Sequence, residues 1–396
     1  MFSRLFLLLF VFLTFGFFSI IQAATFTVTL GGDSTNGACD QFCTLREAIN
    51  AANTNGAGAD VINFNVNPAV AIIQPTSLLP IIKSSLVIDG TTQTGYFGAP
   101  IIVIDGAGAN GFHIETPSPS QSLNVSILGL AINRFTSHGI YADCTNNCNL
   151  TIRGNRIGTN SSGLIDLGNG ADGINIVETG GSTYLIGGAG TFEGNVISGN
   201  EDDGIEIHAR DSSFPSGTGT ATIVGNLIGV NAAGTAAIPN ESVGIYAGES
   251  FHAVIGGASN ASRNVISGNG SHGISLGGKA EIYKNYIGTN AAGTAALGND
   301  GNGIFLFNSA VATIGGTITI LNAPVDLGNV ISGNGVSGIA VFTESPTEPY
   351  QIKRNRIGTN AAGDAAIANQ QFGIFMGYPR HDFDSAARYR LGHERG

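Results

Sequence analysis

The sequence predicts an all-β chain wound as a single-stranded parallel β-helix, and the first observation behind this prediction is a repeat. A unit of the form Asn-x-Ile-[Gly/Ser], with a second Asn five residues after the first, recurs without a miss over residues 150–376. Self-similarity at such a short period is the signature of a solenoid. The three repeated positions are occupied by Asn155, Ile157 and Asn160; Asn195, Ile197 and Asn200; Asn226, Ile228 and Asn231; Asn264, Ile266 and Asn269; Asn285, Ile287 and Asn290; Asn329, Ile331 and Asn334; and Asn355, Ile357 and Asn360.

The second observation is that each unit contains three short runs with period-two alternation, for example 221–224, 226–230 and 244–247. β-Branched residues at the inward positions of these runs indicate strands. Strands this short cannot bury a face alone, but coils stacked about 4.8 Å apart place like residues above like. The isoleucines then form a continuous core, and the stacked Asn side chains can pass amide hydrogen bonds along each column. We therefore interpret both Asn columns as structural.

The third observation is a strict alternation of two unit types. The residue after the repeated Ile is Gly in one type and Ser in the next. A Gly-Ile pair that opens another strand follows the second Asn by thirteen residues in the Gly type and by four in the Ser type. The pattern predicts about eight regular coils, wide and tight in turn. Irregular coils precede them, with strands expected at 61–66, 86–89, 101–105, 112–115, 125–128 and 139–142.

Residues 1–23 have the pattern of a secretory signal, with Arg4 before an apolar run at 5–18 and Ile-Gln-Ala at 21–23 as a cleavage site. A retained membrane anchor is the alternative. No later segment has the roughly 18 uninterrupted apolar residues of a membrane-spanning helix. We therefore expect an exported monomer in the extracellular space, at the cell surface or in the periplasm. The last residues, 379–396, fit no repeat unit, and a C-terminal cap, a disordered end or an incomplete reading frame would each explain them.

Composition and charge restrict the classes of ligand that this protein can bind. Only 11% of the 396 residues are charged, and the formal net charge is −11. This balance argues against nucleic acid, whose binding requires basic stripes. It also repels acidic polysaccharides, so a pectin-like ligand would need bridging calcium or a local basic patch. We predict no other metal and no cofactor.

The four cysteines form two close pairs in the sequence, Cys39 with Cys43 and Cys144 with Cys148. Export to an oxidising compartment allows disulfides to form. The simplest interpretation is that each pair closes a local loop. A shared zinc site would have to collect ligands from places 100 residues apart, which disfavours it.

Residues 24–59 are predicted to cap the first coil. Thr44 and Glu47 have the spacing of a capping box, in which each side chain bonds the backbone of the other at a helix start. An apolar stripe follows, and Asn55-Gly56 ends the helix; the stripe consists of Leu45, Ala48, Ile49 and Ala52. One amphipathic helix ahead of a solenoid would shield the open edge of its first coil. The β-helix itself then spans residues 60–378.

These segments resemble a known class of bacterial exported proteins. Cys43-Thr-Leu-Arg-Glu-Ala-Ile-Asn-Ala-Ala-Asn53, followed by Gly58-Ala-Asp-Val-Ile-Asn-Phe64, is similar to the segment described by the letters CSLREA, with Thr44 in place of the Ser. Such proteins typically continue into right-handed β-helix repeats of the pectin-lyase-like superfamily, and the Asn-Arg-Ile-Gly-Thr-Asn units look like those repeats. The resemblance spans residues 39–376. It implies a right-handed helix and export, and it is weak for activity.

Three Gly-Ile turns carry a second resemblance, to the catalytic motifs of polygalacturonase-type glycoside hydrolases. These turns are Ala171-Asp172-Gly-Ile, Glu201-Asp202-Asp203-Gly-Ile and Ser271-His272-Gly-Ile. The resemblance implies that Asp172, Asp202 and Asp203 form the acid/base group and that His272 assists them. Two carboxylates with separated pKa values are what such hydrolysis requires.

Several features of the sequence count against that hydrolase. The residue before the Gly varies from coil to coil, as expected of an exposed turn, and reads His138, Asp172, Asp203, Val243, His272, Asn302, Ser337 and Phe372. The coil of Val243 places Asp203 and His272 about 10 Å apart. The family's basic Arg-x-Lys motif is missing from the following coil. A polysaccharide lyase would need an Arg or Lys base beside calcium-binding carboxylates, and basic residues are sparse.

The outward residue of the Gly-Ile strand suggests a ligand face instead. Aromatic residues occupy this position on every wide coil from Tyr246 onward, followed by Phe305 and Phe375. Such rings suit stacking against sugars, and burial under the wide-coil loops is the alternative interpretation. We therefore predict a non-catalytic exported scaffold with polysaccharide as its partner. A polygalacturonase-like hydrolase or a polysaccharide lyase is the alternative function.

Overall fold

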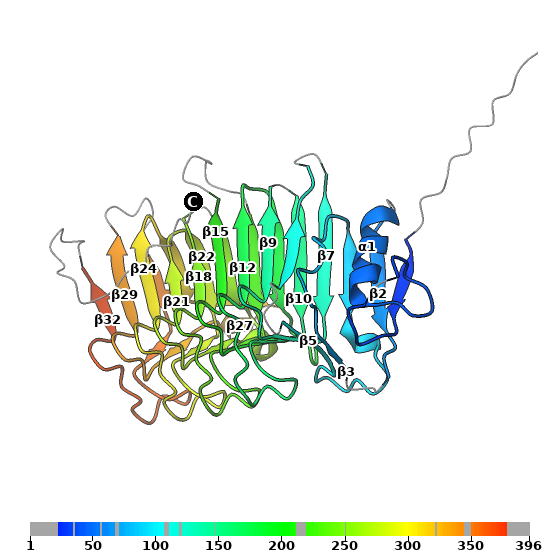
Figure 1. Ribbon diagram of the computed structural model, residues 1–396. Helices are drawn as coiled ribbons and strands as arrows, with labels where there is room; N and C mark the ends of the chain where they lie inside the picture. The colour runs from blue at the N-terminus through cyan, green and yellow to red at the C-terminus, as the bar shows by residue number, and fades with distance from the viewer. Residues whose placement is uncertain are drawn as a thin grey trace, which may run out of the picture.

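The computed structural model confirms the predicted right-handed parallel β-helix, with its coils stacked side by side from α1 at one end to β32 at the other (Figure 1). It describes residues 23–377 except 35, 56–57, 68–70, 107–110, 119–120, 146, 211–218, 250, 321–322 and 344–349. Residues 1–22 of the predicted signal segment and the whole tail, 379–396, lie outside the described residues.

Three long parallel sheets run the length of the stack, and each regular coil contributes one strand to each of them. Sheet A consists of β1 (Thr25–Val28), β2 (Asp60–Phe64), β4 (Leu86–Asp89), β7 (Leu123–Leu128), β10 (Cys148–Arg153), β13 (Thr183–Gly187), β16 (Thr220–Val224), β19 (His252–Gly256), β22 (Lys279–Tyr283), β25 (Val311–Gly315) and β30 (Gln351–Lys353). Sheet B consists of β3 (Ala71–Ile73), β5 (Ile102–Asp105), β8 (Leu130–Asn133), β11 (Arg156–Ile157), β14 (Val196–Ile197), β17 (Leu227–Ile228), β20 (Val265–Ile266), β23 (Tyr286–Ile287), β28 (Val330–Ile331) and β31 (Arg356–Ile357). Sheet C consists of β6 (Phe112–Glu115), β9 (Ile140–Cys144), β12 (Ile174–Glu178), β15 (Ile205–Ala209), β18 (Ile245–Ala247), β21 (Ile274–Leu276), β24 (Ile304–Asn308), β29 (Ile339–Thr343) and β32 (Ile374–Met376).

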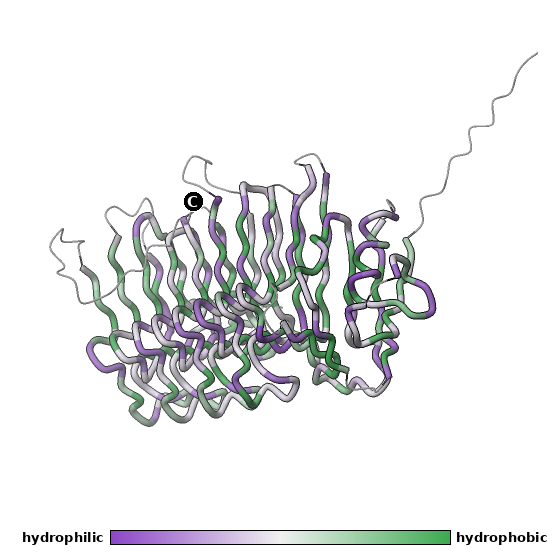
Figure 2. The backbone as a smooth tube through the Cα atoms, viewed as in Figure 1, coloured by the Kyte–Doolittle hydropathy of each residue, from purple (hydrophilic) through white to green (hydrophobic). Residues whose placement is uncertain are grey.

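The core is made of superposed inward side chains. In sheet B, Ile157 pairs with Ile197, which pairs with Ile228, and the column continues in register through every later coil. All of these isoleucines except Ile357 of the last coil are buried, and fully burying one such side chain contributes about 1.5–3 kcal/mol. Hydrophobic and hydrophilic residues alternate along the strands in Figure 2, as they must when successive side chains point to opposite faces.

The N-terminal end carries α1 (Leu45–Asn55), which lies beside β2 in Figure 1. The predicted capping box is present: the Thr44 N–H donates to Glu47 Oε2 at 3.0 Å, and the Glu47 N–H donates to Thr44 Oγ1 at 3.3 Å. The apolar stripe of the helix is buried against the first strands. The capping segment also contributes β1, which pairs with β2 as the first strand of sheet A.

The first Asn column forms a continuous ladder in the turn between sheets A and B, and we call it the first ladder. Each side-chain Nδ2 donates to the Oδ1 of the Asn one coil further on, at 2.8–3.1 Å, through Asn155, Asn195, Asn226, Asn264, Asn285, Asn329 and Asn355. Each Oδ1 in the ladder also accepts the backbone N–H of the preceding Asn. The structural interpretation of this column is therefore confirmed.

The second Asn column differs from the prediction on the wide coils. The second ladder, in the turn between sheets B and C, runs through Asn169, Asn200, Asn240, Asn269, Asn299, Asn334 and Asn369 with bonds of 2.8–2.9 Å. Only its tight-coil members belong to the predicted column. On the wide coils Asn160 and its equivalents instead fold the exposed loop, because Asn160 Oδ1 accepts the N–H groups of Leu164 and Ile165.

The two coil types differ by one residue in the position of the glycine that has a positive φ. Gly158, directly after the repeated Ile, has a φ of 83°, whereas in the tight coil Ser198 follows the Ile and Gly199 has the positive φ of 84°. Residues with a side chain rarely adopt a positive φ, so the position of the glycine sets where the chain turns. The wide-coil loops stack on one another, with the Ala232 N–H donating to Gly163 O at 2.8 Å.

The six strands predicted in the irregular coils are present as β2, β4, β5, β6, β7 and β9, with small shifts at their ends. Strands β3 and β8 were not predicted. Neither was the antiparallel hairpin of β26 (Thr317–Ile320) and β27 (Ala323–Asp326), which is inserted between β25 and β28. Two 3₁₀ turns complete the described elements, at Gly90–Thr92 and Asn260–Ser262. Among the described helices, none combines the length and apolar character needed to cross a bilayer.

Candidate functional site

The residue before each Gly-Ile pair of sheet C belongs to a column of hydrogen-bond acceptors, and we call it the acceptor column. Asp172 Oδ1 accepts the Asp203 N–H at 2.8 Å, and Asp203 Oδ1 accepts the Val243 N–H at 2.7 Å. His138 Nδ1 likewise accepts the Asp172 N–H at 3.3 Å. Further along the stack, His272 Nδ1 accepts from the Asn302 N–H, and Asn302 Oδ1 from the Ser337 N–H.

The interpretation of this column as an exposed turn was wrong for most of its members. Asp172 is 2% exposed and Asp203 is 7% exposed, and Val243, Asn302 and Ser337 are also buried. The physical reason is the backbone N–H at this turn, which needs an acceptor once the next coil covers it. Any polar side chain with a nearby acceptor atom can meet that need, so the residue type varies while the position stays buried.

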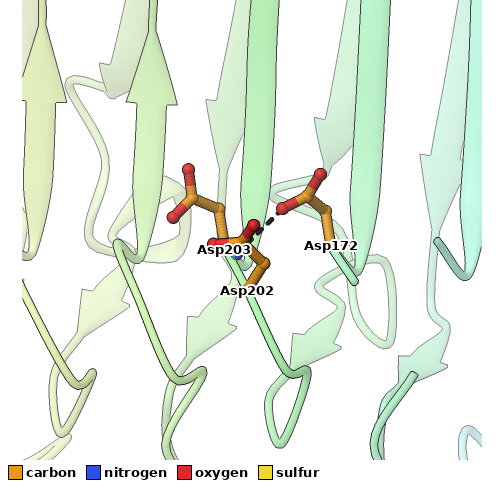
Figure 3. A group of neighbouring side chains, drawn as sticks. All are labelled: Asp172, Asp202 and Asp203. Carbon is orange, nitrogen blue, oxygen red and sulfur yellow. Dashed lines mark hydrogen bonds between the residues drawn. The ribbon is translucent and has the colours of Figure 1, made fainter. Parts of the chain in front are cut away.

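The structure brings the three candidate aspartates together. One carboxylate oxygen from each of Asp172, Asp202 and Asp203 lies within 4.8 Å of the others. Figure 3 shows Asp202 and Asp203 on one turn and Asp172 on the neighbouring turn, with the hydrogen bond between Asp172 and Asp203 dashed. Only Asp202 is exposed. Register explains the convergence, because Ile174 and Ile205, which follow these turns, are paired across β12 and β15.

The shared environment shifts the three aspartate pKa values in different directions. Burial raises the pKa of Asp172, but the hydrogen bond and charge of His138 and the bond from Asn175 outweigh burial and hold it below its usual value. Burial and the neighbouring charge of Asp172 raise the pKa of Asp203 well above its usual value. Partial burial, with the charges of Asp172 and Glu206, raises the pKa of Asp202. One carboxylate of the group is therefore held ionised, and the buried one beside it favours the proton.

Further polar side chains surround the three aspartates, and together they form what we call the polar cluster: Asp172, Asp202, Asp203, His138, Asn175, Glu206 and His208. His138 Nδ1 lies 3.0 Å from Asp172 Oδ2. Asn175 Nδ2 donates to Asp172 Oδ2 at 2.7 Å and to Glu206 Oε2 at 2.6 Å, and Glu206 Oε1 lies 3.0 Å from His208 Nδ1. Sequence reasoning did not assign His138, Asn175 or Glu206 to the site. The signal was present, because His138 precedes the same Gly-Ile pair one coil earlier.

His272, predicted to assist the aspartates, lies elsewhere. Strand β18 separates β15, which follows Asp203, from β21, which follows His272. The His272 ring instead stacks on Phe305 with centroids 4.7 Å apart. Burial lowers the pKa of His272 to about 4, so the ring is neutral near pH 7. The structure thus places His138, and not His272, beside the aspartates.

Calcium was the only metal ion that the sequence analysis allowed as a possible ligand of this protein. Both oxygens of Asp172 already accept protein hydrogen bonds, Oδ1 from the Asp203 N–H and Oδ2 from Asn175 Nδ2. Asp203 Oδ1 is engaged by the Val243 N–H. Calcium takes six to eight oxygen ligands. The arrangement fits carboxylates held by their neighbours better than a calcium site.

Aromatic rings cover the other half of the same face, and we call them the aromatic strip. The predicted rings of Tyr246, Phe305 and Phe375 are joined by three that were not predicted, Phe307, Phe342 and Phe372. Neighbouring centroids lie 5.3–5.9 Å apart along the path Tyr246, Phe307, Phe305, Phe342, Phe375 and Phe372. Such distances are typical of favourable aromatic pairs. The missed rings lie at the second outward position of each strand, or in the acceptor column.

The wide-coil loops do not account for this strip. Gly163 and Gly293 of these loops lie against Arg156 and Tyr286, which are outward residues of sheet B. The strip belongs to sheet C, where Tyr246, Phe305 and Phe375 are half-buried and Phe372 is 51% exposed. A part-exposed apolar row on a rigid sheet is a typical binding surface.

Both predicted disulfides are present. One joins Cys39 to Cys43 beside α1, and the other joins Cys144 to Cys148 between β9 and β10. Each closes a local loop, as the spacing indicated, and the second joins the end of β9 in sheet C to the start of β10 in sheet A.

Comparison with known proteins adds a similarity of chain trace. No protein-family model matches this chain, and no curated protein matches it. Among solved structures, the A-module of mannuronan C-5 epimerase AlgE4 from Azotobacter vinelandii is 14% identical, with a TM-score of 0.43, covering 90% of this chain and 88% of its own. The AlgE6 A-module from the same organism is 12% identical, with a TM-score of 0.32, covering 89% and 98%. At these values the likeness says nothing of what this chain binds or catalyses.

Proposed function

We propose that this protein is an exported β-helix that holds a polysaccharide along the outer face of sheet C and does not cleave it. The observation that carries the proposal is the aromatic strip, which spans β18 to β32 on one rigid sheet. Ring faces offer a large apolar contact area at a small entropic cost, which suits the apolar faces of sugar rings. A sheet with strands about 4.8 Å apart presents these rings at regular spacing to a repeating ligand.

Export is supported by the two disulfides. Such bonds persist in oxidising compartments and are rare in the cytosol. The pairs Cys39–Cys43 and Cys144–Cys148 leave no free cysteine among the described residues. Residues 1–23 would supply the signal for export.

The burial of two of the three aspartates supports binding without cleavage. Asp172 and Asp203 are buried, and each has at least one oxygen bound to the backbone of the next coil. A catalytic acid or base must reach the reacting atoms of the substrate. Of the three aspartates predicted as the acid/base group, only Asp202 faces solvent, so that group as predicted does not reach a substrate.

The test is a double variant, Tyr246→Ala with Phe305→Ala, compared with the unaltered protein on a glycan array. We expect binding to fall at least tenfold, since two of the rings are removed. The matched control is Phe97→Ala, which removes a 91% exposed ring from an irregular coil outside sheet C. Circular dichroism checks that both variants keep the β-helix. Equal loss in the control, or full binding by the folded double variant, would contradict the proposal.

A glycoside hydrolase is the second candidate, favoured by the opposite pKa shifts of Asp172 and Asp203. Pairs of carboxylates shifted apart in this way supply a base and an acid at one pH. The measurement is release of reducing ends from a panel of polysaccharides, with Asp203→Asn as the inactive control. Turnover that disappears in this variant would establish the hydrolase and displace the binding proposal.

A further inference from the structure

The outer face of sheet C contains few basic residues, since none of its nine strands includes a lysine or an arginine. Three outward acids of these strands have partners from outside or within the sheet, as Glu115 pairs with Lys83, Asp143 with Arg210 and Glu206 with His208. The other two sheets differ, since sheet A includes Arg153, Lys279 and Lys353 and sheet B includes Arg156 and Arg356. The basic residues of the strands therefore lie on the two faces that lack the aromatic strip.

Exposed carboxylates also border the strip. Glu201, Glu241 and Asp300 occupy equivalent places in the turns between sheets B and C, with the turn of Gly270 between the last two. Their N–H groups donate to the backbone carbonyls of Asn169, Asn200 and Asn269 of the second ladder. Glu249 is exposed at the opposite edge of the sheet. Within the described part of the chain, none of these four carboxylates forms an ion pair. Their charges are therefore uncompensated on both sides of the rings.

The polar cluster and the aromatic strip meet directly. Glu206 and Tyr246 are register partners on neighbouring strands, so their outward side chains are one strand spacing apart, about 4.8 Å. Asp202 lies exposed at the turn that leads into the strand of Glu206 (Figure 3). A sugar stacked on Tyr246 would thus place its ring substituents near two carboxylates. At such separations a charge on the ligand is felt strongly, and its sign decides between attraction and repulsion.

We infer that the polysaccharide held on sheet C is a cationic one, built from amino sugars whose amino groups are free. This rests on the proposed function and names its ligand class. The rings of the strip take the apolar sugar faces, and the exposed carboxylates of Asp202, Glu241 and Asp300 take the ammonium groups. A uronate polymer meets only repulsion on this face, and a neutral glycan gains nothing from its charge.

The test compares three oligosaccharides of equal length by calorimetry: a β-1,4-linked glucosamine oligomer, its fully N-acetylated counterpart and an oligogalacturonate. The first two share a backbone and differ chiefly in charge. We expect the glucosamine oligomer to bind at least tenfold more tightly than the acetylated one, and the oligogalacturonate not to bind. The preference should shrink as salt is raised from about 0.01 M to 0.5 M, because exposed charges are then screened.

A matched pair of variants locates the preference. Asp202→Asn with Glu241→Gln should abolish most of the tenfold difference and leave binding of the acetylated oligomer in place. Glu281→Gln, which removes an acidic residue from β22 of sheet A, should leave the difference unchanged. Loss of the preference in the sheet A variant would place the cationic ligand on another face and overturn the inference.

The outcomes separate the inference from the proposed function. Equal affinities for the acetylated and free-amine oligomers, both lost in Tyr246→Ala with Phe305→Ala, would overturn the cationic ligand and uphold the binding face. Binding of oligogalacturonate with calcium, abolished by a chelator, would overturn the ligand class in the same way. Failure of all three oligomers and of the wider glycan array to bind would overturn both.

Discussion

The first ladder and the acceptor column solve the same problem in two ways. Both lie in turns between sheets, and both supply an acceptor to the backbone N–H of a neighbouring coil. The first ladder does so with Asn in all seven coils, whereas the acceptor column uses His, Asp and Asn and is interrupted by Val243.

The difference lies in what each side chain can offer. An amide donates and accepts, so each Asn bonds both its neighbours and an identical copy fits on either side. An ionised carboxylate only accepts, so burial and repulsion from Asp172 together raise the pKa of Asp203. Stacking identical residues is therefore favourable in the first ladder and unfavourable in the acceptor column. The residue type can vary along the acceptor column for this reason.

The largest expected effect comes from breaking the first ladder at its middle. Asn226→Ala removes the acceptor of the Asn195 N–H and Nδ2 and the donor to Ile186 O, all of them buried. Unsatisfied buried groups cost about 1–3 kcal/mol each, so we expect a loss of about 3 kcal/mol in the free energy of unfolding. Urea denaturation measures it. A loss below about 1 kcal/mol would show that the ladder is not what holds these turns.

The second ladder allows a sharper comparison between two residues that occupy the same place in the sequence repeat. Asn269 is buried in the ladder, whereas Asn290 is on an exposed wide-coil loop. Asn269→Ala should cost about 2 kcal/mol and Asn290→Ala about 0.5 kcal/mol, because water replaces the lost bonds of the exposed loop. Thermal melting of the two variants decides between them. Equal shifts in Tm would mean that the wide-coil loop is as essential as the core turn.

In the acceptor column, two substitutions at one position should act in opposite directions. Asp203→Ala leaves the buried Val243 N–H without an acceptor and should cost about 1–2 kcal/mol. Asp203→Asn keeps an acceptor oxygen and removes the charge beside Asp172, so it should match or exceed the stability of the unaltered protein at pH 7. Chemical denaturation of both variants is the measurement. A destabilised Asn variant would indicate that the charge of Asp203 is itself needed.

The smallest effect is the pH dependence of that same pair. The pKa of Asp203 is raised above its usual value of 3.8, so between 3.8 and the folded value the native state holds more protons and stability falls as pH rises. Asp172 has a lowered pKa, and its contribution is lost only as pH falls below 3.8 through the folded value. The advantage of Asp203→Asn should therefore grow as pH rises from 3.8 toward the folded pKa of Asp203. An advantage independent of pH would remove the electrostatic explanation.

Only part of the candidate site could be predicted from the sequence. The aspartates could be found because the repeat aligns Asp172 with Asp203 one coil apart. The motif resemblance grouped His272 with the aspartates, although the repeat had already placed the coil of Val243 between Asp203 and His272, and the structure confirms that separation. The motif gave no indication that His138 would lie beside Asp172. Phe307 and Phe342 were missed, since they lie beyond the first outward position that the repeat marks.

The sequence alone determined the architecture of this protein. Short alternating strands and an invariant Asn-x-Ile unit can bury their apolar faces in only one way, by stacking, so the order of the coils and the column of Ile157 follow from the pattern. The tertiary structure decided which side chains are buried at the turns and which Asn of a wide coil enters the second ladder. That outcome depends on where each covered N–H finds its acceptor, and the acceptor is always on another coil, about 20–40 residues away along the chain.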